Sequence, residues 1–282
     1  MYTLRQPHET LRPFIEHYWF VYAPPRQAFE LTVDVFVDGR ADLVLNFGAP
    51  WTRTPVGGRA ARVRGHVLDA QRLVPLKIRQ HGRVVLAGVR FHAGGLAAFV
   101  SQSVHEWTGR LIPAAAVFGG TTRQLVPALR RSAGDADAQA ALFDAFFAER
   151  LEVSDDKRAL WSLLSEIAAA GGLVRIDELC RARGLPIRRV DRMFRAYVGI
   201  SPKTMARIFR FQTALAQLTS DPKCTLAEVA ARCGYYDQPH FVREFKRFAG
   251  TAPKHQVGYF PSEAPTDFSP NLVQYVQDRG DK

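Results

Sequence analysis

The stretch GYYDQPHFVREFKRFAG, residues Gly234–Gly250, decides the fold of the second half of this chain. It joins a glycine, a polar turn and an apolar stripe edged with Arg and Lys, and Gly184–Gly199 repeats the arrangement as GLPIRRVDRMFRAYVG. The segments that lead into the two glycines also align, IDELCRARG at Ile176–Gly184 with LAEVAARCG at Leu226–Gly234. Each is typical of a short amphipathic helix ended by glycine, the residue that best tolerates a left-handed C-cap. Two helices joined by a short glycine turn, present twice, predict a tandem helix-turn-helix.

The second helix of each repeat has one face for the core and one for solvent. Apolar residues recur at i, i+4 and i+7 and predict two buried stripes: Val190, Phe194 and Tyr197, then Phe241, Phe245 and Phe248. The opposite faces hold Arg188, Asp191, Arg192 and Arg195 in the first repeat, and Gln238, Pro239, Val242, Arg243 and Lys246 in the second. Asp237 is expected to cap the second of these helices, whereas Pro186, at the start of the first, has no side-chain oxygen for the free amides.

A long helix is predicted between the two repeats. Pro202–Leu218 has Ile208, Phe211, Leu215 and Leu218 on one face, with Ser201 as its cap. At roughly 1.5 Å per residue it spans about 25 Å, which suits two successive turns of one DNA face.

The outward faces suit DNA binding. A major groove accepts an α-helix, Arg bonds guanine edges in pairs, and Lys or Arg neutralises phosphates. The chain has a net charge of +11, and Glu166–Ser262 contains 16 Lys and Arg against 8 Asp and Glu. For either helix alone, an ordinary amphipathic helix with a solvated charged face explains the pattern equally well. Finding the pattern twice favours sequence-specific DNA binding over a membrane-surface role, since the interleaved aromatic residues fall at core spacing.

The first half of the chain has strand patterns. Phe29–Phe47 alternates apolar and polar residues around Asp38-Gly39, which indicates strand, turn and strand, and His81–Phe91 is a further β-rich run. Helical spacing follows in TTRQLVPALRR and DAQAALFDAFFAERL, and helix patterns dominate from Asp155. We therefore expect an α+β chain with a mainly-β domain over 1–150, an all-α domain over 155–260 and a loose tail over 261–282, in which NLVQYVQ could form a short packed element.

The second half resembles the AraC/XylS family of bacterial transcription regulators over roughly residues 173–260. The resemblance is carried by GLPIRRVDRMFRAYVGISPK, ARIFRFQTALAQL and LAEVAARCGYYDQPHFVREFKRFAGTAPK, and by their spacing. It implies two helix-turn-helix units, joined by a linker helix, that bind adjacent major-groove segments. It also implies base contacts from Arg188, Asp191, Arg192, Gln238, Pro239 and Arg243. The family usually has a small polar cap where Pro186 stands, so this chain departs from the pattern there.

The first half is similar to the regulatory domain of one subgroup of this family, in VDGRADLVLNFGAPW and GRVVLAGVRFHAGGLAAFVSQSVHEWTGRLIP. The similarity implies a small cupin-like β-barrel with flanking helices that could dimerise, which here would be those between Thr121 and Arg150. Its polar candidates for an effector pocket are Asn46, Arg90 and His92. The implied partners are duplex DNA, a small-molecule effector, RNA polymerase and a second copy of the chain.

Enzymatic alternatives find little support in the residues. A metal-dependent cupin-type enzyme needs clustered His and carboxylate ligands, but His66, His81 and His92 stand singly. A fusion with a DNA alkyl-transfer domain needs an acceptor Cys in the first half, which has none. The three cysteines, Cys180, Cys224 and Cys233, fit neither a disulfide framework nor a zinc site. We therefore expect no catalytic residues, metal or cofactor, and, since no membrane-length apolar run or signal peptide is present, a cytoplasmic protein without a membrane partner.

Overall fold

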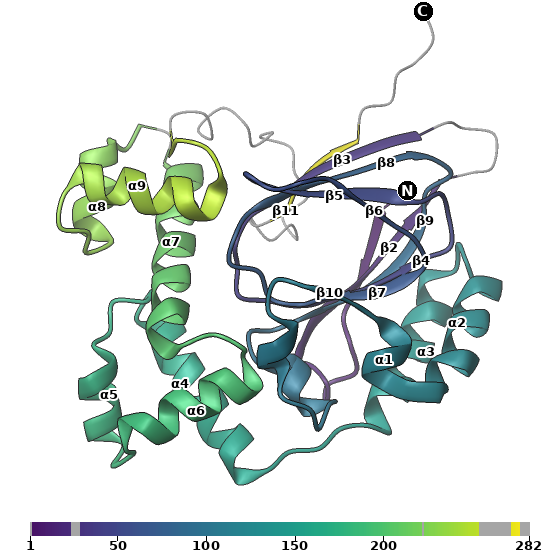
Figure 1. The fold of residues 1–282 in the computed structure, drawn as a ribbon, viewed down its shortest axis with the longest axis horizontal. Coiled ribbons are helices and arrows are strands. Elements are labelled where there is room, and N and C mark those ends of the chain that lie inside the picture. Colours follow the sequence, from purple (N-terminus) through teal and green to yellow (C-terminus); the bar gives the residue numbers. More distant parts are fainter. Residues whose placement is uncertain (1, 24–28, 222, 254–271, 277–282) are drawn as a thin grey trace, which may run out of the picture.

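The computed structural model describes residues 2–23, 29–221, 223–253 and 272–276, and shows two regions, one of strands with three helices and one of helices alone (Figure 1). The first half contains β1 (Tyr2–Arg5), β2 (Ile15–Tyr22), β3 (Phe29–Val35), β4 (Asp42–Asn46), β5 (Trp51–Pro55), β6 (Ala61–Val63), β7 (His66–Asp69), β8 (Leu76–Gly82), β9 (Val85–Phe91) and β10 (Leu111–Pro113). Three helices follow, α1 (Ala114–Phe118), α2 (Thr122–Arg131) and α3 (Ala136–Ala148). The helices of the second half are α4 (Asp155–Ala169), α5 (Ile176–Ala182), α6 (Ile187–Tyr197), α7 (Pro202–Ser220), α8 (Leu226–Arg232) and α9 (Gln238–Ala249). The α+β class is confirmed.

The strands form two facing sheets and not the single closed barrel that was expected. One sheet has the order β1-β2-β9-β4-β7-β10, and the other has β11-β3-β8-β5-β6, with β11 at Leu272–Val276. Among the described residues no strand is hydrogen-bonded into both sheets. In the first sheet side chains alternate, so that Leu43, Val89 and their neighbours pack under α1, α2 and α3. The intervening positions face the second sheet and line the interior.

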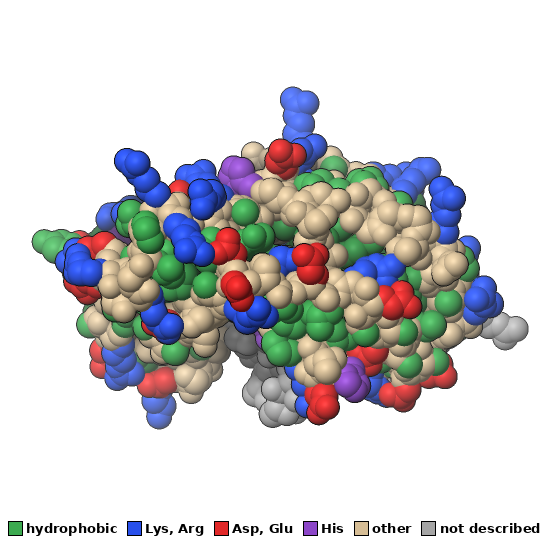
Figure 2. Space-filling model, turned by 90° about the horizontal axis from the view of Figure 1, so that it is seen from below, with side chains coloured by type: hydrophobic (Ala, Val, Ile, Leu, Met, Phe, Trp, Pro, Cys, Tyr) green, Lys and Arg blue, Asp and Glu red, His purple; other side chains and the backbone are tan. Residues whose placement is uncertain are grey.

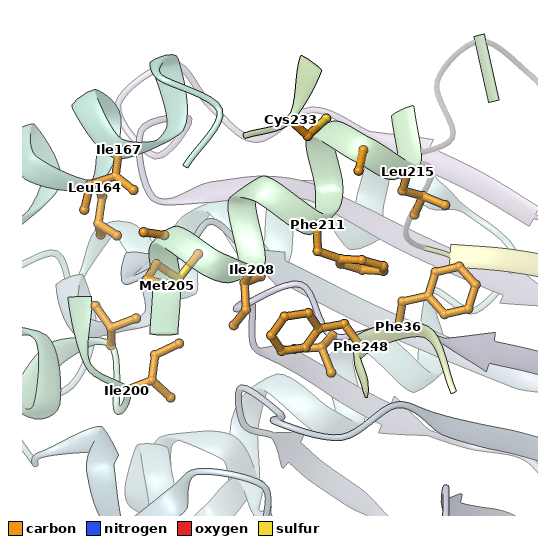
Figure 3. Close-up of a cluster of buried hydrophobic side chains, with 14 of the residues drawn as sticks. Phe36, Leu164, Ile167, Ile200, Met205, Ile208, Phe211, Leu215, Cys233 and Phe248 are labelled. Atoms are coloured by element: carbon orange, nitrogen blue, oxygen red, sulfur yellow. The ribbon is translucent and has the colours of Figure 1, made fainter. Parts of the chain in front are cut away.

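The stretch around Asp38-Gly39 joins the two sheets instead of closing a hairpin. β3 pairs with β8 and β11, whereas β4 pairs with β7 and β9. The turn is diverted because Phe36 and Val37 are buried in the core of the helical region, and the Asp38 carboxylate pairs with Arg90 of β9. Figure 3 shows Phe36 beside Phe211 and Phe248.

Local signals account for the helical region. The side chain of Ser201 caps α7 at the amide of Thr204, and Ile208, Phe211, Leu215 and Leu218 are all buried, as predicted. α5 and α8 end in the same way: Gly184 and Gly234 have φ of 60° and 62°. The next residue in each case bonds back to the helix, from the amide of Leu185 to the carbonyl of Cys180 and from that of Tyr235 to that of Ala230. The internal repeat is therefore present in the backbone as well as in the sequence.

α7 connects the two repeats. In Figure 1 it stands between α5 and α6 at one end and α8 and α9 at the other, with α4 against its start. Its 19 residues span about 28 Å. Within the described part of the chain no helix is long and apolar enough to cross a membrane.

A short connection lies between α3 and α4. α3 ends at Ala148, and Ser154 caps α4 through the amide of Lys157, which leaves a short connection where the division was expected. Of the tail predicted over 261–282, only Leu272–Val276 lies within the described residues, as the edge strand β11 paired with β3.

Candidate DNA-binding site and interior cavity

α6 presents the expected charged face to solvent. Val190, Met193 and Phe194 turn inward, with Tyr197 half-buried against the same core. This spacing leaves Arg188, Arg192 and Arg195 exposed and Asp191 half-exposed. The helix starts without a side-chain cap, because Pro186 supplies none and its carbonyl accepts from the amides of Arg189 and Val190.

Two of these arginines are unengaged in the described structure. Neither Arg188 nor Arg192 makes a hydrogen bond or ion pair with another described residue, so each can turn to an external acceptor at little cost. Arg195 differs, because its Nε lies 2.9 Å from Oδ2 of Asp191 one turn earlier. Asp191 and Arg195 are therefore occupied with each other, whereas the first two arginines are available.

α9 presents a less charged face. Asp237 caps it, as expected, by accepting from the amide of His240 at 2.6 Å. Four of the predicted residues are exposed, namely Gln238, Pro239, Arg243 and Lys246. Val242 is half-buried and packs against the core cluster, so fewer of its atoms can reach a partner. Sequence reasoning missed Tyr236, which is 93% exposed just before the cap and is the kind of aromatic side chain that an interface would cover.

A groove of about 1120 Å³ runs between the two helix-turn-helix units. It is lined by the start of α6 (Arg188 and Asp191), by α7 (Lys203, Arg207 and Arg210), by the start of α5 and by His240 and Glu244 of α9. Viewed from below, the helical lobe at the left of Figure 2 is edged with Lys and Arg side chains. The first turns of both predicted recognition helices therefore border one basic groove.

Glu244 fixes α9 against α7. Its carboxylate is 2% exposed and lies 2.7 Å from Nε of Arg207 and 3.1 Å from Nη2 of Arg210. Arg210 also stacks over the ring of Tyr235 at 4.7 Å. Sequence reasoning missed this group, although the signal was present: Glu244 stands three residues after Phe241, inside the apolar stripe, where a carboxylate needs a cationic partner.

The interior between the two sheets contains a cavity of about 80 Å³. Its walls are mostly apolar and come from seven strands of the two sheets, with Val21, Val33, Val35, Val44, Ile78 and Leu86 among the apolar residues. Trp19 and Trp51 contribute rings, and His17, Asp42, Asp69, Arg72, Gln80 and Arg90 contribute polar groups. A cavity that is mainly apolar with a few convergent polar groups is typical of a small-molecule site.

Of the three residues predicted for an effector pocket, only Arg90 lines this cavity. Asn46 lies on the inner side of β4, but its amide is held by the β4–β5 turn, through Ala49 and Gly48. His92 follows the end of β9, and burial lowers the pKa of its ring. Among the described residues no group of three or more His, Cys, Asp or Glu side chains is placed to hold a metal ion.

Buried charges border the cavity on one side. Arg90 pairs with Asp38 and with Asp42, Arg72 lies 3.1 Å from Asp42, and Arg53 lies 3.1 Å from Asp69. Burial by itself raises the pKa of Asp38, but the neighbouring guanidinium groups of Arg90 and Arg72 outweigh it, and the net shift is downward. Asp38 is therefore held as a carboxylate at the junction between the cavity and the helical region.

Two sequence-family profiles match the chain. One, described as a helix-turn-helix domain, covers residues 179–256, and the other, a domain of unknown function (DUF6597), covers residues 4–113. No curated protein matches the chain in a sequence search.

Similar solved structures include ToxT from Vibrio cholerae, at 8% identity over 82% of this chain and 97% of that one, with a TM-score of 0.45. The C-terminal domain of AraT, a response regulator from Geobacillus stearothermophilus, matches at 19% identity over 41% of this chain and 95% of that one, with a TM-score of 0.34. A xylose-binding transcription activator, xylR, matches at 20% identity over 38% of this chain and 28% of that one, also with a TM-score of 0.34. The chain therefore contains a helix-turn-helix domain at residues 179–256, preceded by a domain that matches the profile of unknown function.

Proposed function

We propose that α6 and α9 enter adjacent major-groove segments of one DNA face and that a small molecule bound between the two sheets modulates this binding. In this proposal residues 155–260 form the DNA-binding domain and residues 1–150 the regulatory domain. The helices between Thr121 and Arg150 are proposed to contact a second copy of the chain. The helix-turn-helix domain and the resemblance to the AraC/XylS family support a transcription regulator and not an enzyme. We therefore place the protein in the cytoplasm, where RNA polymerase is a further candidate partner.

One observation carries the DNA-binding proposal. The unengaged Arg188 of α6 and the first turn of α9 border the same groove along α7, so both helices present their N-terminal turns on one side. Glu244 supports this arrangement, because its pairs with Arg207 and Arg210 keep α9 from turning away from α7. Helix N-terminal turns that project from one side suit two successive major-groove segments.

The first unit is proposed to supply most of the direct base recognition. Arg188 and Arg192 are exposed and unengaged, whereas the second unit has Pro239 and the half-buried Val242 at the corresponding positions. Neither of these side chains can make paired hydrogen bonds to a base. The second unit is therefore proposed to rely on Lys246 for phosphate contact, with Gln238 and Arg243 as its candidates for bases.

A binding-site selection with the full-length protein tests the proposal. From a pool of random duplexes we expect a site with two conserved segments on one face, about one helical turn apart, and an affinity that falls steeply with salt. Binding that shows no preference over random duplex at any salt concentration would contradict the proposal.

A further inference from the structure

We propose that the cavity between the two sheets takes an uncharged, compact and largely apolar molecule that presents acceptor oxygen, of ketone or amide type, to Arg72 and Trp51. This inference rests on the effector role proposed above and specifies the chemical class of that effector.

The walls set the size and the apolar character of the ligand. The cavity of about 80 Å³ is enclosed mainly by Val, Ile and Leu side chains and by two indole rings. The indole of Trp19 packs directly on Gly88, its partner residue in β9. Any side chain at position 88 would collide with it, because a Cβ there would lie 2.0 Å from Cε2 of Trp19. A space of this size holds on the order of five to ten non-hydrogen atoms. A single ring with one short substituent fits this description.

Unpartnered donors in the wall indicate the polar group. Arg72 is 1% exposed, and its Nε and Nη1 have no hydrogen-bond partner among the described residues. Trp51 is 3% exposed, and its Nε1 is likewise without a partner. Both side chains line the cavity. A buried donor left without an acceptor is costly, so an acceptor oxygen from a ligand would stabilise these donors.

The charge balance around the cavity excludes an acid. Three buried arginines, Arg53, Arg72 and Arg90, are matched by three buried aspartates, Asp38, Asp42 and Asp69. His17, which also lines the cavity, has its pKa lowered by burial, so it stays neutral near pH 7. A carboxylate ligand would therefore add a negative charge with no free cation to balance it, and an amine would add an unbalanced positive one.

Four ring compounds of nearly equal size test the class on the full-length protein: acetophenone, ethylbenzene, benzoate and benzylamine. Dissociation constants come from calorimetry and from the change in tryptophan fluorescence, to which Trp19 and Trp51 of the cavity wall contribute. We expect acetophenone to bind at least fivefold more tightly than ethylbenzene, which lacks the acceptor, and at least tenfold more tightly than the two ions.

A substitution checks that the acceptor meets the indole. Trp51→Phe keeps an aromatic wall and removes the donor, so it is expected to weaken acetophenone about fivefold and leave ethylbenzene unchanged. Trp107→Phe is the matched control, since Trp107 packs against the other face of the first sheet and does not line the cavity. Equal weakening of acetophenone by both substitutions would overturn the contact with Trp51.

The outcomes separate this inference from the proposed function. If benzoate or benzylamine binds more tightly than acetophenone, the cavity is a ligand site but the uncharged class is wrong. If none of the four binds, the cavity is not a site for this class, and the effector role proposed for it fails as well. Neither result bears on the DNA-binding proposal, which the duplex selection decides alone.

Discussion

Arg192 stands in the second turn of α6, exposed and without an ion-pair partner among the described residues. Asp191 and Arg195, which flank it on the exposed side of the helix, differ, since Nε of Arg195 lies 2.9 Å from Oδ2 of Asp191. An exposed pair of this kind contributes little to folding stability, but both partners must separate before either can bond a base. At the scale of single residues, the unengaged arginines are therefore the better candidates for base contacts.

Arg192→Ala is expected to cost about 1–3 kcal/mol of DNA-binding free energy and to relax preference at one or two base positions, because a paired contact to a base edge is lost. The measurement is a binding-site selection with the variant, after circular dichroism has shown normal folding. Arg131→Ala, at an exposed arginine of α2, is the control and should leave the selected site unchanged. A variant that keeps the full wild-type preference would show that α6 does not insert as proposed, and the uncapped start at Pro186 would be the first cause to examine.

Lys246→Ala is expected to weaken binding to all duplexes by a similar factor and to reduce the slope of log affinity against log salt by about one. The reason is that Lys246 is exposed in the last turn of α9, where a lysine meets phosphate more readily than base edges. Salt titrations with the selected site and with a random duplex measure both effects. A loss confined to the selected site would assign Lys246 to base recognition instead.

At the scale of elements, the segment between β3 and β4 links the two halves of the chain. Val37 donates its amide to the carbonyl of Phe248 at 3.0 Å, and Gln212 of α7 donates to the carbonyl of Asp38 at 2.9 Å. The Asp38 carboxylate meanwhile pairs with Arg90, which lines the cavity. One short segment therefore contacts both the cavity wall and the helices that hold α9.

Gly39→Ala tests how closely this segment packs on α7. Gly39 has φ of +71°, and a Cβ there would lie 2.6 Å from Cε of the buried Met205. Gly57→Ala is a matched control, because φ is +75° and no atom lies within 4 Å of the added Cβ. Both variants should lose about 1–2 kcal/mol of unfolding free energy from the left-handed backbone. Gly39→Ala should lose about 1 kcal/mol more, because the flexible end of the buried Met205 must shift, as measured by urea denaturation. Equal losses would show that the segment does not pack on α7.

At the scale of the whole molecule, the first half of the chain contacts the C-terminal ends of α6 and α9, the two proposed recognition helices. After α6, the carbonyl of Gly199 accepts from Nδ1 of His105 and from the hydroxyl of Thr108, each at 3.0 Å, in and just after the 3-10 helix Val104–Trp107. Near the end of α9, the carbonyl of Phe248 accepts a hydrogen bond from the amide of Val37, in the segment between β3 and β4. The N-terminal turns of the same helices border the open groove. The first half of the chain therefore contacts both helices at the ends that lie away from the groove.

Thr108→Val is expected to widen the tolerated spacing between the two DNA segments, because it removes one of the bonds that hold the end of α6. Binding to sites with one base pair inserted or deleted should improve roughly three- to fivefold relative to the wild-type protein, in line with the loss of about 1 kcal/mol of restraint. Thr121→Val, whose hydroxyl bonds only the nearby carbonyl of Phe118, serves as the control. An unchanged spacing preference would show that the first half does not set the distance.

The sequence by itself determined the helical region, for reasons of local physics. The repeat, the glycine turns at Gly184 and Gly234, the caps at Ser201 and Asp237 and the apolar face of α7 all depend on residues within a few positions of one another. A helix is built from hydrogen bonds between residues four positions apart and repeats every 3.6 residues, so its pattern can be recognised in one sequence. The outward faces of the two recognition helices follow from the same periodicity, apart from the half-buried Val242.

Only the tertiary structure decided the arrangement of the sheets and the content of the cavity. The pattern of β3 and β4 is the same whether they form a hairpin or lie in two sheets, because alternation specifies a buried face and not a partner strand. The charge pairs join residues far apart in the chain, such as Asp42 with Arg72 and with Arg90, and no local pattern encodes such pairing. Asn46 was predicted for the pocket and Trp51 was not. The turn after β4 binds the amide of Asn46 through the carbonyl of Ala49, whereas Trp51 lines the cavity, and the sequence alone does not specify the geometry of that turn. Long-range pairing of buried charges, and not local propensity, joins the cavity wall to the segment that contacts α7 and α9.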